Sequence, residues 1–522
     1  MKIYEILERL NRKEWLLPPF QRDFVWNDMG KIIKFVDSLY RGYPIGSIII
    51  WRPSEEEIKG RIIEASVKGE PWYPREYILD GQQRLTTIYR IFQGDSFVFK
   101  GEEFILHFDI ENEKFCFVKK GEKIKKIVPF HEIINKSNEE LIKELKLKTD
   151  KEKIRATSLF EKVRKIKERP LVVEPSPPLK REEALELFIR LNTGGRPLET
   201  ENLALGYISI KWNDAREKLE EFRNKIQVTG FKFDFDFFIR CLSAISLGQS
   251  LKKKIVPKFG EKNVEKDWEK TKIGIERLID FLKGELNLHS NRFIEAENTL
   301  IPLVLLFVNG KDIVGRERSL LAYAFVVSYL NRRYSGGKFR NLDRDIKLIL
   351  EKDNPIEEWV KALEKDKETL THFEPSDIIE TPNRALKLPL FILLKERGVS
   401  RDLLGRNLID SATAEENRPE FHHIFPKKWL RGTPFERERN HIANLTLITS
   451  ISNKEINRQK PDYLHHIDDE IKEQHFIPKD KGLYKIAKYD EFIRRRQKLI
   501  AEALNKFLEE KRGNKETPSS MF

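Results

Sequence analysis

The sequence predicts a mainly helical α+β protein with small sheets near both ends of the chain. Three observations support this fold class. Amphipathic helical patterns dominate residues 207–404. Short runs typical of strands fall in the first 180 residues or so. Near the C-terminus, residues 441–449 are apolar and β-branched, and polar helix formers follow at residues 452–459.

The N-terminal elements follow in order. Residues 1–10 carry charges between their apolar positions, which indicates an amphipathic helix and not a signal peptide. A second helical pattern covers residues 29–40, and a strand is expected next. The expected strands are residues 45–51, 77–80, 104–110, 114–119 and 170–174. Pro175, Pro177 and Pro178 are expected to break the last strand in a turn.

Composition limits the class of protein. The 522 residues suffice for two to four domains, and the net charge of +13 suits a polyanionic partner. Cys116 and Cys241 fit no metal or disulfide framework, so a reducing cytoplasm is the expected location. The most apolar stretch, residues 300–308, is shorter than the roughly 20 residues that span a bilayer. We therefore expect a soluble protein with no membrane partner.

The region most informative about function begins at Pro419 and reads Pro-Glu-Phe-His-His-Ile-Phe-Pro. Phosphodiester cleavage requires a base to activate water, a cation, and a group that orients the base. Neighbours on a strand face opposite sides, so His422 and His423 cannot share one role. We predict His423 as general base, His422 as a metal ligand, Asn444 as the partner of the base imidazole and Asn453 as the second ligand.

A histidine pair alone is more often a surface or packing feature than a catalytic one. Six of the ten histidines, however, fall between His422 and His475. The predicted strands around His423 and Asn444, with the helix that carries Asn453, would form a ββα unit. The ordered set therefore favours a nuclease site.

These residues resemble the HNH (His-Asn-His) endonucleases, in the branch found in the GmrSD type IV restriction enzymes. The resemblance implies a ββα-metal nuclease domain in which His422, His423, Asn444 and Asn453 keep the roles given above. Asn457, one helical turn later, is the alternative second ligand. Because the last position is Asn and not His, the site favours Mg²⁺ (or Mn²⁺) over Zn²⁺.

A second motif, Asp-Gly-Gln-Gln-Arg at residues 80–84, lies between a predicted strand and a predicted helix. Gly81 would let backbone amides approach an anion at the start of the helix, and Arg84 could reach the same phosphate. This arrangement predicts a nucleotide or phosphate pocket. Asp80 and Gly81 alone would be an ordinary turn, and Gly194 with Gly195 in a third segment would be an ordinary helix end.

Together these segments resemble the N-terminal domain of GmrSD-type proteins, which is related to the ParB/sulfiredoxin-like fold. The resemblance spans about residues 1–210 and implies binding and hydrolysis of a nucleoside triphosphate (ATP, GTP, CTP or UTP) that gates the nuclease. The matching residues are Gln21, Arg22, Asp80, Gly81, Gln82, Gln83, Arg84, Arg190, Asn192 and Gly195. The chain has no Walker-type phosphate loop, so P-loop chemistry is not expected.

The predicted domains are a nucleotide-binding domain (1–206), a helical linker or recognition domain (207–404), an HNH nuclease domain (405–510) and a disordered tail (511–522). The favoured function is an NTP-regulated, Mg²⁺-dependent endonuclease that cleaves modified foreign (phage) DNA. The alternative is a nucleotide-binding switch whose HNH domain only binds DNA or cleaves RNA. With one nuclease site per chain, cutting both strands of a duplex would be easiest for a homodimer.

Overall fold

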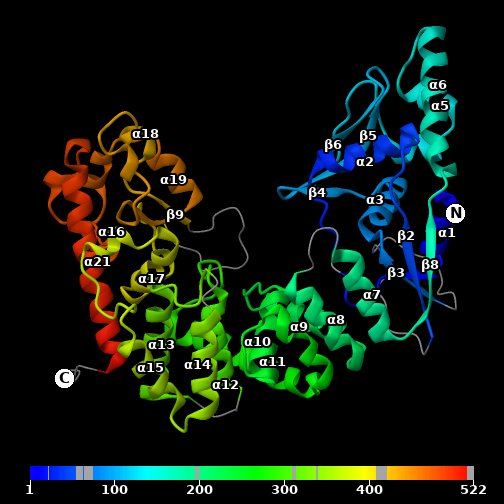
Figure 1. Cartoon of the computed structure of the whole chain (residues 1–522). Helices are drawn as coiled ribbons and strands as arrows, with labels where there is room; N and C mark the ends of the chain where they lie inside the picture. The colour runs from blue at the N-terminus through cyan, green and yellow to red at the C-terminus, as the bar shows by residue number, and fades with distance from the viewer. Residues whose placement is uncertain are drawn as a thin grey trace. The chain divides into compact units, whose positions relative to one another are not determined.

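The computed structural model describes residues 1–21, 23–54, 63, 75–193, 199–308, 313–336, 339–406 and 420–513. The fold is α+β and about 59% helical, as the sequence predicts. The chain divides into two compact units (Figure 1). The first comprises Met1–Arg216 with Val256–Gly260, and the second Glu217–Ile255 with Glu261–Phe522. The predicted boundary between residues 404 and 405 lies inside the second unit.

The first unit combines two small sheets with several helices. Its strands are β1 (Trp15–Leu16), β2 (Ile48–Pro53), β3 (Glu76–Asp80), β4 (Phe97–Phe99), β5 (Glu102–Asp109), β6 (Lys114–Lys119), β7 (Ile127–Pro129) and β8 (Val173–Leu179). Its helices are α1 (Ile3–Asn11), α2 (Met29–Arg41), α3 (Gln82–Gln93), α4 (Phe130–Asn135), α5 (Asn138–Glu144), α6 (Asp150–Arg164), α7 (Arg181–Thr193) and α8 (Thr200–Lys211).

The first sheet has the order β1-β3-β2-β8, and the second has the order β4-β5-β6 with β7 paired to β5. In the first sheet, β3 is parallel to β1 and antiparallel to β2, whereas β8 is parallel to β2. The first sheet thus places the carboxyl end of β3, where the Asp-Gly-Gln-Gln-Arg sequence begins, beside β2.

Local sequence explains why α2 forms where the pattern predicts it. The Asp28 carboxylate caps the helix by accepting from the backbone N–H of Gly30 at 2.8 Å, and Gly42 ends it at φ +88°. The buried side chains, which fall at helical spacing on one face, are Ile32, Phe35, Val36 and Leu39. This face joins the main hydrophobic core of the unit.

The structure corrects the prediction for the proline-rich segment. Residues 175–178 do not form a turn, because β8 continues through them to Leu179. A proline has no N–H to donate, so a strand rich in proline is tolerated only where that N–H needs no partner. β8 meets this condition because it lies at the edge of its sheet.

The second unit is mostly helical. Its helices are α9 (Ala215–Gln227), which begins at the boundary, α10 (Phe235–Leu247), α11 (Val264–Leu286), α12 (Ile301–Phe307), α13 (Gly315–Leu330), α14 (Phe339–Glu351), α15 (Pro355–Lys365), α16 (Asp377–Glu380), α17 (Asn383–Glu396), α18 (Lys427–Leu430), α19 (Ser450–Ile456), α20 (Asp469–Gln474) and α21 (Tyr489–Arg512). Its strands are β9 (Glu420–His423) and β10 (Leu445–Ile448).

Helix α13 lies at the centre of this unit. Its last 11 residues, from Leu320 to Leu330, are all buried, which is typical of a helix covered on every side. It contacts α11, α15, α17 and α21. Among the residues that the structure describes, every helix is too short or too polar to cross a membrane. Most of the predicted tail lies outside the described residues, although α21 extends to Arg512.

Candidate active site

The predicted ββα unit is present in the second unit. Strands β9 and β10 form an antiparallel hairpin in which His423 pairs with Leu445 and His422 with Thr446. Helix α19 follows β10 directly, and the Thr449 hydroxyl caps it by accepting from the N–H of Ser452. The two histidines are neighbours on a strand, so their side chains face opposite sides of the hairpin.

The imidazole of His423 is held in its neutral form. Burial, together with the positive charge of Lys427, lowers its pKa from 6.5 to about 4, so the imidazole is uncharged at neutral pH. Its Nε2 lies 3.2 Å from Oδ1 of Asn440. With an amide oxygen facing Nε2, that nitrogen carries the proton, and Nδ1 keeps the lone pair that can accept a proton from water.

The structure corrects the predicted partner of this imidazole. Asn444 is completely buried and bonds to backbone groups. Its Oδ1 accepts from the N–H of Phe425 at 2.8 Å, and its Nδ2 donates to the carbonyls of Phe425 (3.1 Å) and Arg439 (2.9 Å). Asn444 therefore fixes the loop between the strands, and Asn440 on that loop contacts the base. Sequence spacing could not separate two asparagines four residues apart.

His422, the predicted metal ligand, lies beside an acidic side chain. Its Nε2 is 3.6 Å from Oε2 of Glu420, and Glu420 also forms an ion pair with Arg292. Burial lowers the pKa of His422 below its ordinary value, which favours the neutral form that can act as a ligand.

The two alternatives for the second ligand contact each other. Asn457 Nδ2 donates to Asn453 Oδ1 at 3.1 Å across one turn at the end of α19. This contact uses the Asn457 nitrogen and one lone pair of the Asn453 oxygen, so each side-chain oxygen keeps a lone pair for a cation. The contact therefore does not decide between Asn453 and Asn457 as the ligand.

The donor types of His422 and Asn453 fit a hydrated Mg²⁺. One neutral imidazole and one amide oxygen make a weak set, and Mg²⁺ commonly keeps several waters and takes few protein ligands. No group of three or more His, Cys, Asp or Glu side chains among the described residues is placed to hold a metal.

A buried arginine from α21 supports the hairpin. The Arg496 guanidinium is fully buried and donates to the carbonyls of Ala443 (2.7 Å), Leu445 (2.8 Å) and His475 (3.1 Å). These bonds satisfy backbone acceptors at the start of β10, where the strand leaves the loop. The sequence does not indicate this role of Arg496, because an arginine within a charged helical pattern is expected to be exposed.

The Asp-Gly-Gln-Gln-Arg sequence forms the predicted strand-to-helix junction in the first unit. Asp80 ends β3, Gly81 has φ +92°, and α3 begins at Gln82. A Cβ at Gly81 would lie 2.3 Å from Ile48 Cδ1 as well as in a left-handed conformation, so only glycine fits here. The junction thus brings β2, β3 and α3 into close contact.

Arg84 differs from its predicted role in this structure. One terminal nitrogen donates to Asp80 Oδ2 at 2.9 Å, and the other donates to the carbonyl of Ile45 at 2.7 Å. The side chain is mostly buried, at 16% exposure. Arg84 therefore braces α3 against the segment before β2, and both terminal nitrogens already have acceptors.

The first motif and the box are joined by glutamine side chains. Gln21 Nε2 donates to the carbonyl of Leu79 at 2.7 Å, next to the end of β3. Gln83 accepts from the N–H of Val25 at 2.8 Å and donates to the carbonyl of Asp23 at 3.1 Å. Gln82 is buried at the start of α3. The predicted residues Gln21, Gln82, Gln83 and Arg84 are therefore brought together around Asp80 and Gly81.

The third motif is less tightly connected to the box. Arg190 is exposed on α7 and pairs with Glu186, while Asn192 donates to the carbonyl of Phe188 at 2.8 Å. Phe188 packs against Phe20 with ring centroids 5.0 Å apart, which connects α7 to the first motif. The predicted residues Arg22 and Gly195 lie outside the described residues.

Comparisons with known proteins bear on the first unit. Residues 3–209 match the family of the GmrSD restriction endonuclease, N-terminal domain. This part of the chain is therefore similar to the N-terminal domain of a restriction endonuclease. The match supports the predicted resemblance of the N-terminal region to GmrSD-type proteins.

A second comparison covers nearly the whole chain. An uncharacterized protein of Methanocaldococcus jannaschii is 24% identical over 542 residues, an alignment that covers 92% of this chain and 88% of the relative. The similarity extends through both units, so the relative combines comparable N- and C-terminal regions in one chain.

Proposed function

We propose that this protein is an NTP-regulated, divalent-metal-dependent endonuclease that cleaves modified foreign DNA. The observation that carries the proposal is the β9–β10 hairpin, which presents the neutral imidazole of His423 next to Asn440. The GmrSD N-terminal domain supports a restriction-nuclease role and DNA as the substrate. The net charge of +13 suits a DNA partner.

In this proposal His423 activates the attacking water. Nδ1 accepts a proton from water as the water oxygen forms a bond to phosphorus, and the bond from phosphorus to the leaving strand oxygen breaks. Lys427 and Arg439 place positive charge near the imidazole, which favours approach of a phosphate. His422 and Asn453 would hold Mg²⁺ or Mn²⁺, which supplies neutralisation of charge on the phosphate.

The regulatory part of the proposal rests on the first unit. Gly81 is buried against Ile48, and the N–H groups at the start of α3, which follow it, favour an anion. Because Arg84 is paired with Asp80, binding of a triphosphate there would require this pair to open or the phosphates to be held by backbone groups alone. Cleavage assays with each nucleotide in turn distinguish ATP, GTP, CTP and UTP.

The test is cleavage of a panel of phage DNAs with different modifications, with Mg²⁺ and each NTP added or omitted. The parental chain should cut at least one modified DNA, and His423→Ala should abolish cutting while NTP hydrolysis persists. His466→Ala, which removes an exposed histidine from the same unit, is the matched control and should cut normally. Cutting by His423→Ala at the parental rate would exclude His423 as the base.

A further inference from the structure

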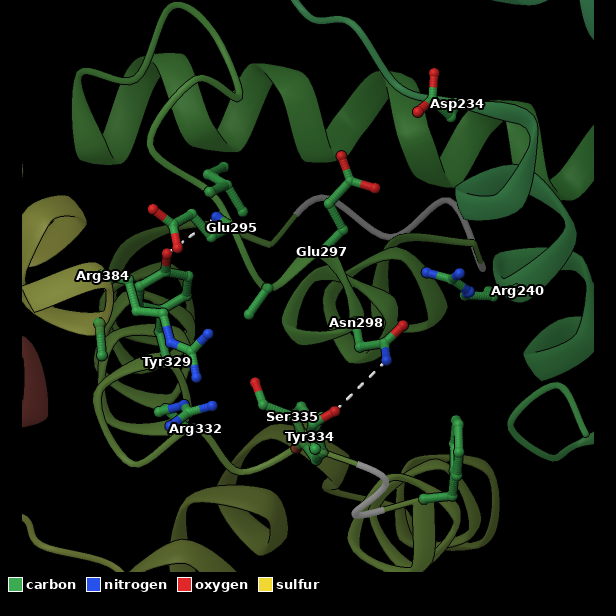
Figure 2. A pocket seen from close by; sticks show the side chains of 15 residues that line it. Asp234, Arg240, Glu295, Glu297, Asn298, Tyr329, Arg332, Tyr334, Ser335 and Arg384 are labelled. Atoms are coloured by element: carbon green, nitrogen blue, oxygen red, sulfur yellow. Dashed lines mark hydrogen bonds between the residues drawn. The ribbon is translucent and has the colours of Figure 1, made fainter. Parts of the chain in front are cut away.

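A cavity in the second unit has no part in the function proposed above. Its volume is about 620 Å³, within the range typical of small-molecule sites. The walls come from residues 294–298, the first half of α10 with its N-cap Asp234, the end of α13, and the starts of α14 and α17 (Figure 2). The cavity thus lies where α10, α13, α14 and α17 meet.

The cavity carries strong charge of both signs. Figure 2 shows the guanidinium groups of Arg332 and Arg384 on one side and Arg240 on the other, with the carboxylates of Glu297 and Asp234 above them. Within the part of the chain that the structure describes, the Arg332 and Arg384 side chains have no hydrogen-bonding or ion-pairing partner. Two unpaired guanidinium groups on one wall attract an anion, and phosphate suits their geometry.

The backbone at Arg332 is strained toward the cavity. Arg332 has φ +48°, a left-handed conformation that is unfavourable for a residue with a side chain. Such strain persists only where the surrounding structure imposes it, and it concentrates at ligand sites.

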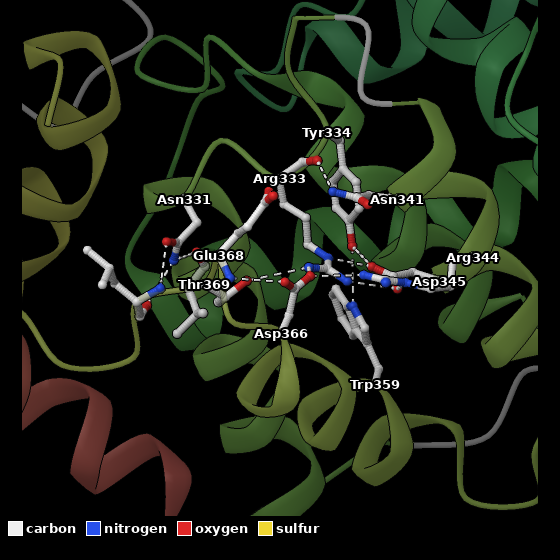
Figure 3. Close-up of polar contacts among 12 residues, drawn as sticks. Asn331, Arg333, Tyr334, Asn341, Arg344, Asp345, Trp359, Asp366, Glu368 and Thr369 are labelled. Carbon is white, nitrogen blue, oxygen red and sulfur yellow. Dashed lines mark hydrogen bonds and ion pairs between the residues drawn. The ribbon is translucent and has the colours of Figure 1, made fainter.

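The residues that flank Arg332 are fixed by a buried polar network (Figure 3). Arg333 is 2% exposed and pairs with Asp345 and Asp366, in each case at 2.7 Å. The Tyr334 hydroxyl donates to Asp345 at 2.7 Å, and Asn331 bonds to the backbone of residue 370 in both directions. This network holds the strained conformation, so Arg332 is positioned at the cavity before any ligand arrives.

Hydrogen-bond acceptors complete the lining. Asn298 Oδ1 is buried without a partner among the described residues, while its Nδ2 is directed to the carbonyl of Tyr334. An unpaired buried acceptor destabilises the fold, so a donor from a ligand would be favourable there. Glu297 is next to it, and burial raises the pKa of its carboxyl group. The amide and exocyclic N–H groups of a nucleobase are donors of this kind.

The cavity walls continue into the nuclease hairpin by two routes. Arg292, just before the first wall segment, forms an ion pair with Glu420 on β9, and Phe293 packs against Phe421 with ring centroids 5.2 Å apart. On the other side, Asn383 precedes Arg384 and donates to the carbonyl of Asn440.

The second route ends at the general base, because Asn440 also contacts His423. A movement of Arg384 would therefore be transmitted to the His423 imidazole through two consecutive hydrogen bonds.

We propose that this cavity binds one nucleotide unit, with Arg332 and Arg384 on its phosphate and with Asn298 and Glu297 accepting from its base. Its occupancy then aligns Asn440 with His423. Only the coupling to His423 rests on the proposed nuclease function, and the binding does not. The nucleotide is either free or part of a DNA strand, and the two sources share this chemistry.

Binding is measured on the full chain without divalent metal, by calorimetry with deoxynucleoside monophosphates and by fluorescence anisotropy with a labelled single-stranded oligodeoxynucleotide. Arg332→Gln and Arg384→Gln should each weaken binding about tenfold or more, the loss of a charge-assisted contact. Arg316→Gln removes an exposed arginine at the opposite end of α13 and should bind as the parent does. Melting temperatures identify any variant that fails to fold. Two cavity variants are used so that the test still gives a result if one of them does not fold.

Loss of monophosphate binding in the two cavity variants supports a free nucleotide, and loss of oligonucleotide binding alone supports a nucleotide within a strand. Parental affinity for both probes in the variants, or no binding of either probe by the parent, would overturn the proposal. His423→Ala separates the two hypotheses, because it should lose cleavage and keep binding. If the cavity variants lose binding while His423→Ala still cuts, the assignment of the base fails and the cavity site stands.

Discussion

His423 and Asn440 form a hydrogen bond of 3.2 Å although 17 residues separate them in the chain. The bond joins a strand residue to a loop residue, and the loop is fixed independently by the buried Asn444 amide. Asn440 is thus assigned to orienting the His423 imidazole, and Asn444 to closing the loop. The two roles can be separated by mutation.

Asn440→Ala should reduce cleavage without unfolding the protein. Asn440 is exposed, and its side chain contributes the contact to His423 Nε2, so its loss frees the imidazole to rotate and to change tautomer. We expect kcat to fall by about 10- to 100-fold, the scale for losing a group that orients a ligand or base. Single-turnover cleavage and a thermal melt check this prediction. Parental kcat in the variant would contradict the orienting role.

Asn444→Ala, in contrast, should mainly reduce the stability of the protein. It removes three hydrogen bonds to backbone groups of Phe425 and Arg439 and leaves buried donors and acceptors unpaired. The free energy of unfolding should fall by about 3 kcal/mol, because each unpaired buried group costs about 1–3 kcal/mol. Denaturant unfolding measures this loss. A variant as stable as the parent, but inactive, would restore Asn444 as a direct partner of the base.

The acid limb of the cleavage profile should lie well below pH 6.5. Burial and Lys427 hold the pKa of His423 at about 4, so the base stays neutral and competent down to that region. Activity is lost as pH falls through the pKa and the lone pair becomes protonated. Asn440→Asp places a negative charge at the imidazole and should move the limb upward. The pH dependence of kcat/KM for the two proteins tests both statements.

The second unit should lose stability in mild acid through His475. This imidazole is buried, and its Nδ1 contacts the Thr446 hydroxyl while its Nε2 contacts the carbonyl of Arg401. Burial lowers its pKa from 6.5 to about 4. Above pH 6.5 it is neutral in both the folded and unfolded chains. Between pH 6.5 and 4 only the unfolded chain binds the proton, so folding loses up to about 3 kcal/mol.

The matched comparison for His475 uses two glutamine variants. His475→Gln should lessen the slope of melting temperature against pH between 6.5 and 4, while His423 and His441, whose pKa values are also lowered to about 4, keep their own contributions. His466→Gln changes an exposed histidine and should leave the parental slope. Equal slopes in all three proteins would mean that His475 does not carry the effect.

Arg84→Ala should weaken NTP binding and also destabilise the first unit. Arg84 joins Asp80 to the carbonyl of Ile45, and its removal leaves that junction unbraced. We expect the free energy of unfolding to fall by about 1–3 kcal/mol, the range for a hydrogen bond to a charged group. Arg12→Ala, which breaks an exposed pair with Glu8, is the control and should change neither quantity. Unchanged NTP affinity in Arg84→Ala would argue against a nucleotide site at the box.

The elements predicted best were those with local causes. The capped helix α2, the β3–α3 junction and the strands β5 and β6 follow from periodicity and from glycine or capping residues near their ends. The strand predicted at residues 170–174 overlaps β8 but ends too early, because proline argues against a strand and whether its N–H needs a partner depends on its place in the sheet.

The site was predicted in its residues and only partly in its contacts. The order of His422, His423, Asn444 and Asn453 predicted a hairpin followed by a helix. Which asparagine faces the base depends on the path of the 21-residue connection between β9 and β10. Contacts such as Arg496 with the start of β10 come from a helix some 50 residues later, and local pattern cannot predict them.

The three prolines of β8 have a consequence for assembly. An exposed sheet edge can accept a strand from another molecule, but it needs N–H donors spaced along it. Pro175, Pro177 and Pro178 remove three N–H groups from β8, and because successive strand N–H groups point to opposite sides, part of this loss falls on the open edge. The opposite edge, β1, is only two residues long. Neither edge of this sheet therefore offers a template for continuous pairing with a strand of another molecule.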